Sequence, residues 1–227
     1  MTGAHRPSGA GHRRAVALFG GTFDPLHLGH IAVAQAAERR FHLDAIYFIP
    51  SSRPPHKSQR ELTPFIHRYA MVTLGCAEHA GFVPSLAEAP AQGPPHVFYT
   101  IDTVRRFHRE HPDDHVYFIV GADQFLELPT WKNYESLLDA CDFIIASRPG
   151  FRLDALRLVI PPEKLGSSTA PDPQKIVLRK SAVHLLTTVA NHVSSTEVRE
   201  RLEKRHSIHG LVPARVEEYI LRQALYR

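Results

Sequence analysis

Short apolar runs alternate with segments of helical pattern along most of this 227-residue chain. Each run has the length of a strand, and near-continuous apolarity is typical of strands that are buried on both faces. This alternation predicts an α/β fold in which helices cover both faces of a mainly parallel sheet. The predicted strands are residues 15–19, 45–49, 82–83, 116–120, 143–146 and 183–186, and the predicted helices are residues 28–40, 64–78, 99–110, 124–127, 134–139 and 213–225.

The segments that directly follow the predicted strands carry glycines and polar residues. In open α/β sheets, ligands bind at the carboxyl ends of the strands. Four such segments, residues 20–30, 50–57, 121–123 and 147–150, are therefore expected to meet at one edge of the sheet. The fold we expect is a Rossmann-like, doubly wound parallel sheet with a small helical part at the C-terminus and a ligand site at this edge.

The loop after the first predicted strand reads Gly-Gly-Thr-Phe-Asp-Pro-Leu-His-Leu-Gly-His over residues 20–30. Glycines let backbone amides approach a ligand closely, and the following helix adds unpaired N–H groups and the positive end of its dipole. His27 and His30 are three residues apart, so they can converge on one group. The run lacks the lysine of a Walker-type loop and the further ligands of a metal site. It predicts an anion site, whereas an ordinary βα turn explains the glycines but not both histidines.

A second polar segment stands near the C-terminus. Ser194 and Glu197 have the spacing of a capping box, which predicts the start of a helix. A cap satisfies only some of the first-turn amides. The remaining amides and the hydroxyls of Ser195 and Thr196 are available to a phosphate, and Arg199 carries a guanidinium fork suited to phosphate oxygens.

Composition narrows the class of protein. No apolar run approaches the roughly 18 residues of a membrane helix, and the Gly/His/Arg-rich start is unlike a secretory signal. Residues 1–13 are expected to be a disordered tail and residues 14–227 a single domain. Cys76 and Cys141 are too few for a disulfide framework, which favours a cytoplasmic protein. The net charge of +4 is spread along the chain, which suits anionic small molecules better than nucleic acid.

The chain holds 16 histidines, an unusually large number. Several lie in evident loops, and most are expected to be solvated. His27, His30 and His56 are the three that stand in a motif.

Together these motifs resemble a known superfamily. The run over residues 20–30 is similar to the HxGH signature of nucleotidyltransferases, and the Ser-Ser-Thr-x-x-Arg segment to their second signature. Other segments resemble those of bacterial nicotinate-nucleotide adenylyltransferases, and the resemblance runs from about residue 15 to the C-terminus. These are Pro-Pro-His-Lys at 54–57, Tyr-Thr-Ile-Asp-Thr at 99–103, Gly-Ala-Asp at 121–123, Leu-Pro-Thr-Trp at 128–131, Arg-Pro-Gly at 148–150 and Leu-Val-Pro at 211–213.

The resemblance implies an enzyme of NAD biosynthesis. It would join ATP and nicotinate mononucleotide, with Mg²⁺, to form nicotinate adenine dinucleotide and pyrophosphate. The implied nucleotide-site residues are Gly20, Gly21, Thr22, Phe23, Gly121 and Asp123, the last reaching a ribose hydroxyl. The implied phosphate-site residues are His27, His30, Ser195, Thr196 and Arg199, with His30 most tied to the transition state. Lys57 is implied near the substrate phosphates, and Thr100 and Trp131 near the nicotinate ring.

Alternatives stay open at this point. Phosphopantetheine or nicotinamide mononucleotide is an alternative acceptor, and a non-catalytic nucleotide-binding regulator is an alternative of another class. For Trp131, the alternative to a contact with the substrate is ordinary packing. Residues 92–99 depart from the family pattern, and residues 153–180 form a longer, more Pro-rich stretch than the resemblance leads us to expect. The oligomeric state is open, with a homo-oligomer as one alternative.

Overall fold

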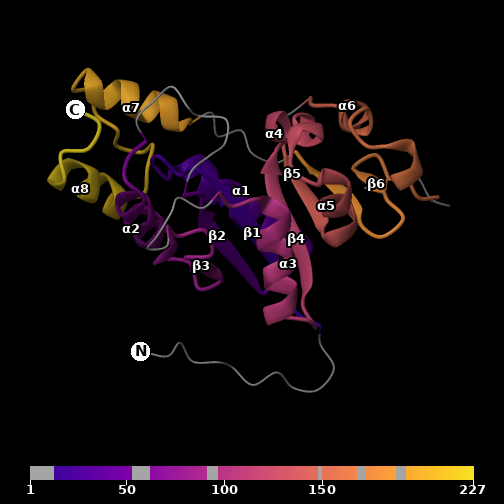
Figure 1. Cartoon of the computed structure of the whole chain (residues 1–227). Coiled ribbons are helices and arrows are strands. Elements are labelled where there is room, and N and C mark those ends of the chain that lie inside the picture. The colour runs from indigo at the N-terminus through magenta and orange to yellow at the C-terminus, as the bar shows by residue number, and fades with distance from the viewer. Residues whose placement is uncertain (1–12, 53–61, 91–96, 148–149, 168–171, 188–192) are drawn as a thin grey trace.

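The computed structural model describes residues 13–52, 62–90, 97–147, 150–167, 172–187 and 193–227. These residues form a seven-stranded sheet with the order β3-β2-β1-β4-β5-β7-β6 (Figure 1). The strands are β1 Ala15–Gly21, β2 Ala45–Pro50, β3 Phe82–Pro84, β4 His115–Gly121, β5 Asp142–Ala146, β6 Lys175–Val177 and β7 Ala182–Leu186. Neighbouring strands are parallel except β6 and β7, which pair antiparallel at one edge.

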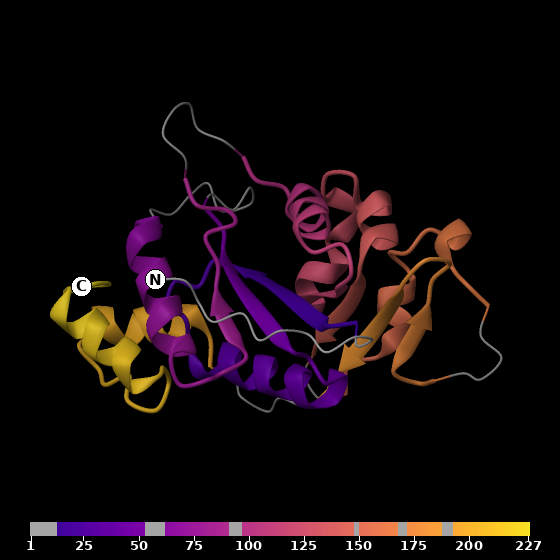
Figure 2. The same ribbon diagram turned by 90° about the horizontal axis from the view of Figure 1, so that it is seen from below.

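Helices cover both faces of the sheet, as two views at right angles show (Figures 1 and 2). One face carries α1 Leu28–Phe41, α2 Phe65–Cys76, α7 Ser195–Glu203 and α8 Ala214–Arg222. The other carries α3 Thr100–Glu110, α4 Ala122–Leu126, α5 Tyr134–Ala140 and α6 Leu153–Arg157. Two short 3₁₀ turns, Leu128–Thr130 and Pro162–Lys164, complete the described helical elements. The doubly wound fold expected from the sequence is confirmed.

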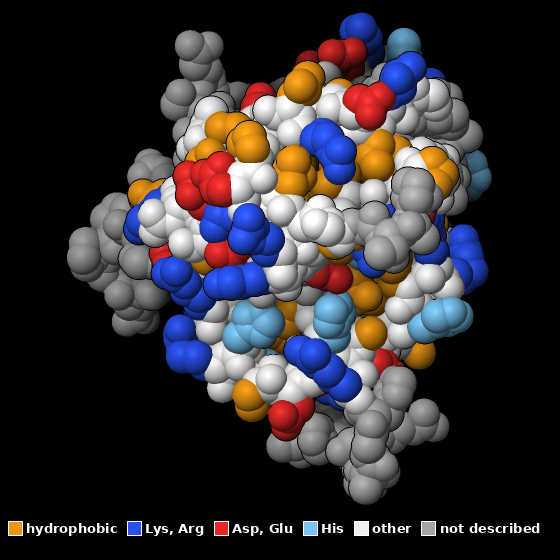
Figure 3. Space-filling view, turned by 90° about the vertical axis from the view of Figure 1, so that its right-hand side faces the viewer, with side chains coloured by type: hydrophobic (Ala, Val, Ile, Leu, Met, Phe, Trp, Pro, Cys, Tyr) orange, Lys and Arg blue, Asp and Glu red, His pale blue; other side chains and the backbone are white. Residues whose placement is uncertain are grey.

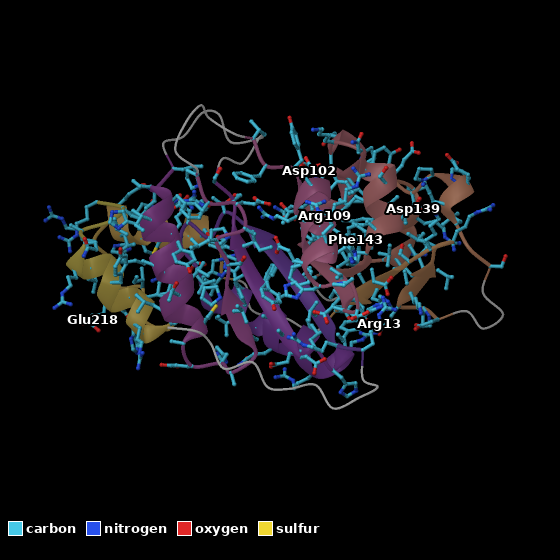
Figure 4. All side chains as sticks on the ribbon, turned by 60° about the horizontal axis from the view of Figure 1, so that its bottom comes forward. Arg13, Asp102, Arg109, Asp139, Phe143 and Glu218 are labelled. Carbon is cyan, nitrogen blue, oxygen red and sulfur yellow. The ribbon has the colours of Figure 1, made fainter. Side chains whose placement is uncertain are left out.

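Side chains of the inner strands alternate between the two apolar layers. In β1, Val16 and Leu18 pack on the side of α3, whereas Ala17 and Phe19 pack on the side of α1. Successive strand residues point to opposite faces, so a strand that is covered on both sides is apolar throughout. Phe143 of β5 lies in the α3-side layer (Figure 4), where it is fully buried. Every predicted strand is present, and its ends differ from the prediction by at most two residues.

The segment between β5 and β7 differs from the prediction. This segment belongs to the Pro-rich stretch of residues 153–180, in which the sequence predicts no helix or strand, so α6 and β6 are both absent from the prediction. Both elements are too short to show a periodicity of their own. β6 forms because Ile176, which is buried, pairs with Val183 of β7, a contact that local pattern does not reveal.

The start of the chain lies outside the described residues, apart from Arg13 of the predicted tail. The Arg13 side chain donates a hydrogen bond to the carbonyl of Asp113 at 3.1 Å. Cys76 and Cys141 are buried, free thiols. Among the described helices, none is long and apolar enough to cross a membrane.

Candidate active site

A cavity of about 510 Å³ opens at the carboxyl ends of β1, β4 and β5 and extends to the first turns of α1 and α7. This is the sheet edge at which the sequence predicts a ligand. Nine of the predicted site residues line it, namely Gly20, Gly21, Thr22, Phe23, His27, His30, Gly121, Asp123 and Ser195. Other lining residues, among them Gln124, Phe151 and Val193, have no site role predicted from the sequence.

A second cavity, of about 830 Å³, lies over α6 and β6 on the face shown in Figure 3. On that face, Lys and Arg side chains are spread among acidic and hydrophobic ones. The Arg152 guanidinium in its wall is paired with Asp154 at 2.7 Å, and both side chains are exposed. We place the reactive site in the smaller cavity because the glycine loop and the histidine pair line that one.

The glycine loop turns back on itself at Phe23. Phe23 adopts a φ of 48°, in the left-handed region that bulky residues rarely occupy. Its ring is buried and folds over Gly21, where a Cβ atom would stand 2.9 Å from the ring. Gly21 is therefore required by this turn. Phe23 forms part of the cavity wall mainly as a buried support for the ring of His30, whose centroid is 5.0 Å away.

His27 and His30 meet at the start of α1. His27 is the N-cap residue, and its backbone N–H donates to Nδ1 of His30 at 3.2 Å. The two rings are stacked, with centroids 3.7 Å apart. Gly29 makes this stacking possible, because a Cβ there would come within 2.9 Å of His27 Nδ1. The pattern His-x-Gly-His thus has a geometric reason beyond helix capping.

The electrostatics of His27 are those of a buried, neutral ring. Burial lowers the pKa of His27 to about 4, because the charged form loses its hydration. Its Nδ1 atom is buried and has no hydrogen-bond partner among the described residues. The hydroxyl oxygen of Ser147, which follows β5, is also buried and has no hydrogen-bond partner among the described residues. Buried polar atoms are normally satisfied, and a polar ligand in this cavity would satisfy both atoms.

The second motif lies behind the first loop. The Ser194 side chain caps α7 by accepting from the Glu197 N–H at 3.1 Å, as the sequence predicts. The Ser195 hydroxyl donates to the carbonyl of Pro25 at 3.0 Å. Buried Arg199 donates through one terminal nitrogen to the Asp24 carbonyl at 2.6 Å and through the other to Thr196 Oγ1 at 3.0 Å.

The predicted roles of this motif divide accordingly. Ser195 lines the cavity, but Thr196 and Arg199 do not belong to its described lining. The structure therefore brings the Arg199 guanidinium against the loop that carries the histidines. Its predicted contact with phosphate oxygens stays a prediction.

Asp123 reaches the cavity from the other side. Gly121 ends β4 and begins α4 in extended conformation, with φ −70° and ψ 150°. Asp123 stands in the first turn of α4 and is exposed toward the cavity, next to Gln124. A carboxylate at this position can accept a hydrogen bond from a hydroxyl group of a ligand.

None of the residues predicted to hold the acceptor belongs to the described lining of the cavity. Lys57 falls outside the described residues. Thr100 begins α3, and half-buried Trp131 packs edge-on against Phe118 at a centroid distance of 6.2 Å. Phe118 lies below the glycine loop, 3.2 Å from where a Cβ of Gly20 would stand. Trp131 is thus one ring away from the cavity, and its contact with a substrate stays a prediction.

The fold and the lining of this cavity define a Rossmann-like α/β protein with a glycine loop and a histidine pair at its ligand edge. A family model described as cytidylyltransferase-like matches residues 18–201. A probable nicotinate-nucleotide adenylyltransferase from Moorella thermoacetica is 41% identical over 213 residues, covering 93% of this chain and 91% of that one. A protein of the same name from Geobacter sp. (strain M21) is 37% identical, covering 92% and 96%. The chain therefore belongs to the cytidylyltransferase-like family and, within it, to the nicotinate-nucleotide adenylyltransferases.

A solved structure supports the same fold. Plasmodium falciparum nicotinic acid mononucleotide adenylyltransferase complexed with NaAD superposes with a TM-score of 0.71 over 94% of this chain and 98% of that chain. Its sequence is 20% identical, so the likeness concerns the fold. The enzyme class and the fold expected from the sequence are confirmed.

Proposed function

We propose that this enzyme joins ATP and nicotinate mononucleotide to give nicotinate adenine dinucleotide and pyrophosphate, a step of NAD biosynthesis. The observation that carries the proposal is the cavity that gathers the glycine loop, the stacked pair of His27 and His30, and the start of α7. A cavity lined by polar groups and backbone amides of this kind suits a nucleoside triphosphate. Family membership supports the choice of acceptor.

The reaction needs positioning more than a protein nucleophile. The attacking group is a phosphate monoester, which is already largely ionised at neutral pH. The enzyme has to hold two anions in line and stabilise charge on the pyrophosphate that leaves. Positioning contributes roughly 7–11 kcal/mol in favourable cases, and a single aimed donor contributes about 3–4 kcal/mol.

His30 is the donor that we assign to the transition state. Its Nδ1 accepts the His27 backbone N–H, so in the neutral ring the proton sits on Nε2. We assign that N–H to an oxygen of the α-phosphate. His27 is held neutral by burial, and an anion placed beside it favours the protonated form. Both rings thus gain interactions when charge develops in the cavity.

The other contacts follow from the elements around the cavity. We assign Ser195 and the first-turn amides of α7 to the β- and γ-phosphates, with the positive charge of Arg199 behind them and Thr196 as its hydrogen-bond partner. Asp123 is assigned to a ribose hydroxyl and the backbone of Gly20, Gly21 and Thr22 to the nucleotide. For the acceptor we propose Lys57, Thr100 and Trp131, since an indole ring stacks well on a flat heteroaromatic ring.

Magnesium enters this scheme bound to ATP. Mg²⁺ in nucleotide sites is commonly held by substrate phosphates and water with few protein ligands, and we assign no residue of the chain to it. When bound, it would neutralise charge on the departing pyrophosphate. We also propose a cytoplasmic location, because the buried thiols of Cys76 and Cys141 are free, as is usual in a reducing compartment.

Product analysis tests the proposal. The purified protein is incubated with ATP, Mg²⁺ and, in turn, nicotinate mononucleotide, nicotinamide mononucleotide or phosphopantetheine, and each product is identified by mass. We expect nicotinate adenine dinucleotide and stoichiometric pyrophosphate as the dominant outcome. Preferred turnover of another acceptor would overturn the choice of substrate. No pyrophosphate with any acceptor would favour a nucleotide-binding regulator.

A further inference from the structure

The C-terminal end of the chain reaches the glycine–histidine loop. The Tyr226 hydroxyl donates a hydrogen bond to Asp24 Oδ1 at 2.6 Å, across 202 residues of sequence. The chain turns back after α8, because Ala224 and Tyr226 both have φ in the left-handed region and Leu225 N–H bonds to the carbonyl of Ile220. The penultimate residue is thereby directed to the active-site edge of the sheet.

Asp24 is a buried junction of contacts. Only 4% of the surface of Asp24 is exposed, although its side chain is a carboxylate. Oδ1 accepts from Tyr226, Oδ2 lies 3.4 Å from the Thr63 backbone N–H, and the carbonyl accepts from Arg199 at 2.6 Å. The fully buried Arg68 guanidinium adds positive charge nearby and bonds to the carbonyls of Thr22, Ser51 and Thr63. Asp24 is therefore fixed from several elements at once.

The position of Asp24 matters for the site because of its neighbours in sequence. Phe23, one residue before it, holds a strained φ of 48° and lines the cavity. His27, three residues after it, begins α1 and donates its N–H to His30. Strained backbone at a functional site persists when the surrounding structure holds it in place. An anchor at Asp24 is well placed to hold both Phe23 and His27.

We propose that Tyr226 is a positioning residue for the active site. Its hydroxyl locks Asp24 and so keeps residues 23–27 in the conformation that presents His27 and His30 to the cavity. The C-terminal turn is thereby part of the catalytic apparatus, although it touches no reacting atom. The activity readout rests on the proposed function, whereas the structural readout below does not.

The Tyr226 hydroxyl keeps its proton, so it can always donate the hydrogen bond to Asp24. Burial, the charge of Asp24 and the hydrogen bond to it raise the pKa of Tyr226 far above its ordinary value, against smaller opposing effects of Thr63 and Arg199. The phenol accordingly stays protonated at every working pH. The Tyr226 ring also packs against the apolar layer that contains α2 and α8, so removing the hydroxyl alone leaves that packing in place.

Tyr226→Phe therefore separates positioning from packing, and Tyr219→Phe is its matched control. Tyr219 is also a partly buried tyrosine of the same layer, but its hydroxyl bonds to His67 Nδ1 at 2.8 Å, away from the loop. We expect Tyr226→Phe to lower kcat about tenfold or more, since small misplacements of reacting groups cost up to about a hundredfold. The KM for ATP and the melting temperature should stay close to those of Tyr219→Phe. Equal kcat values for the two variants would overturn the proposal.

Two further measurements keep the test decisive. Hydrogen–deuterium exchange of the loop peptide that contains residues 23–27 should be faster in Tyr226→Phe than in wild type and unchanged in Tyr219→Phe. This readout needs no substrate, so it distinguishes failure of the positioning role from failure of the proposed reaction. In an Asp24→Asn background, Tyr226→Phe should cost less than it does in wild type. Additive losses in kcat, or unchanged exchange in the loop, would contradict an action through Asp24.

Discussion

Two pairs of histidines lie at opposite edges of the same sheet, and they behave differently. His27 and His30 stack at the carboxyl edge, where they line the cavity. His115 and His184 flank Asp142 toward the amino ends of β4, β5 and β7, with ring nitrogens 3.2 and 3.7 Å from the carboxylate. The two pairs differ in their charged neighbours, because at the amino edge the Asp142 carboxylate places a negative charge beside the imidazole rings.

The pKa values express this contrast. Burial by itself raises the pKa of Asp142, but hydrogen bonds from His115 and the Ala182 N–H, the nearby ring of His184 and the charge of His115 bring it well below its usual range. At the carboxyl edge, burial lowers the pKa of His27 to about 4, and no group among the described residues opposes this shift. The Asp142 carboxylate therefore balances one pair within the fold, whereas the His27–His30 pair lines the ligand cavity.

The largest expected effect is that of His30→Ala at the carboxyl edge. Loss of one donor to the transition state should lower kcat about 10²–10³-fold, while the dissociation constant for ATP changes little. Steady-state kinetics and ATP titration measure the two quantities. His115→Ala is the control at the other edge, and its kcat should equal that of wild type. A loss that lay wholly in ATP affinity would rule out the transition-state role of His30.

Arg199→Ala should come next, because it weakens ATP and pyrophosphate binding alike. Charge-assisted hydrogen bonds contribute roughly 1.5–3 kcal/mol, which corresponds to about a 10- to 150-fold loss of affinity. Calorimetric titration with pyrophosphate isolates this effect. Arg201→Ala on the same helix is the matched control, since its guanidinium pairs with Glu197 and is 44% exposed. Unchanged affinity for both ligands would leave Arg199 as a support of the Asp24 loop alone.

Gly29→Ala should have an intermediate effect on the histidine pair. The added Cβ would stand 2.9 Å from His27 Nδ1, so the ring must move. We expect kcat to fall about tenfold, since misplacement of about 1 Å can cost a hundredfold. The measurement is kcat together with the melting temperature. A variant that is fully active would show that the stacking of His27 on His30 is dispensable.

The smallest effect on activity, and a clear one on stability, is expected for Asp142→Asn. The folded-state pKa of Asp142 is lowered, so its stabilisation is fully present above the unfolded value of about 4 and is lost as the pH falls below it. The variant should be about 1–3 kcal/mol less stable at pH 7, and its stability should decline less in acid. Urea unfolding between neutral and acidic pH measures this. A large loss of kcat in the folded variant would contradict the claim that the histidine pair at the amino edge serves stability and not activity.

The sequence was sufficient for the features that depend on local pattern. Apolar runs predict the strands, and the spacing of His27, Gly29 and His30 after a strand predicts the loop. Motif context also separated these two histidines, together with His56, from the other thirteen. Such features are encoded within about a dozen residues, where strand and helix periods differ visibly.

Features that depend on distant contacts were not predictable. Arg199 meets the Asp24 carbonyl across 175 residues, and Tyr226 meets its carboxylate across 202. Ser147 faces the cavity because β5 ends there, and no local signal assigns its hydroxyl to a ligand. His115 and His184 meet Asp142 because of the register of neighbouring strands. Tertiary structure decides each of these positions.

The most direct test of the contrast is histidine-selective ¹⁵N NMR, with ring signals assigned by substitution. The protein is titrated with a non-hydrolysable ATP analogue and Mg²⁺, and then with nicotinate mononucleotide. Our account predicts that ring-nitrogen signals of His27 and His30 shift on binding, while those of His115 and His184 stay in place. Unmoved signals at His27 and His30 in a saturated complex would contradict it.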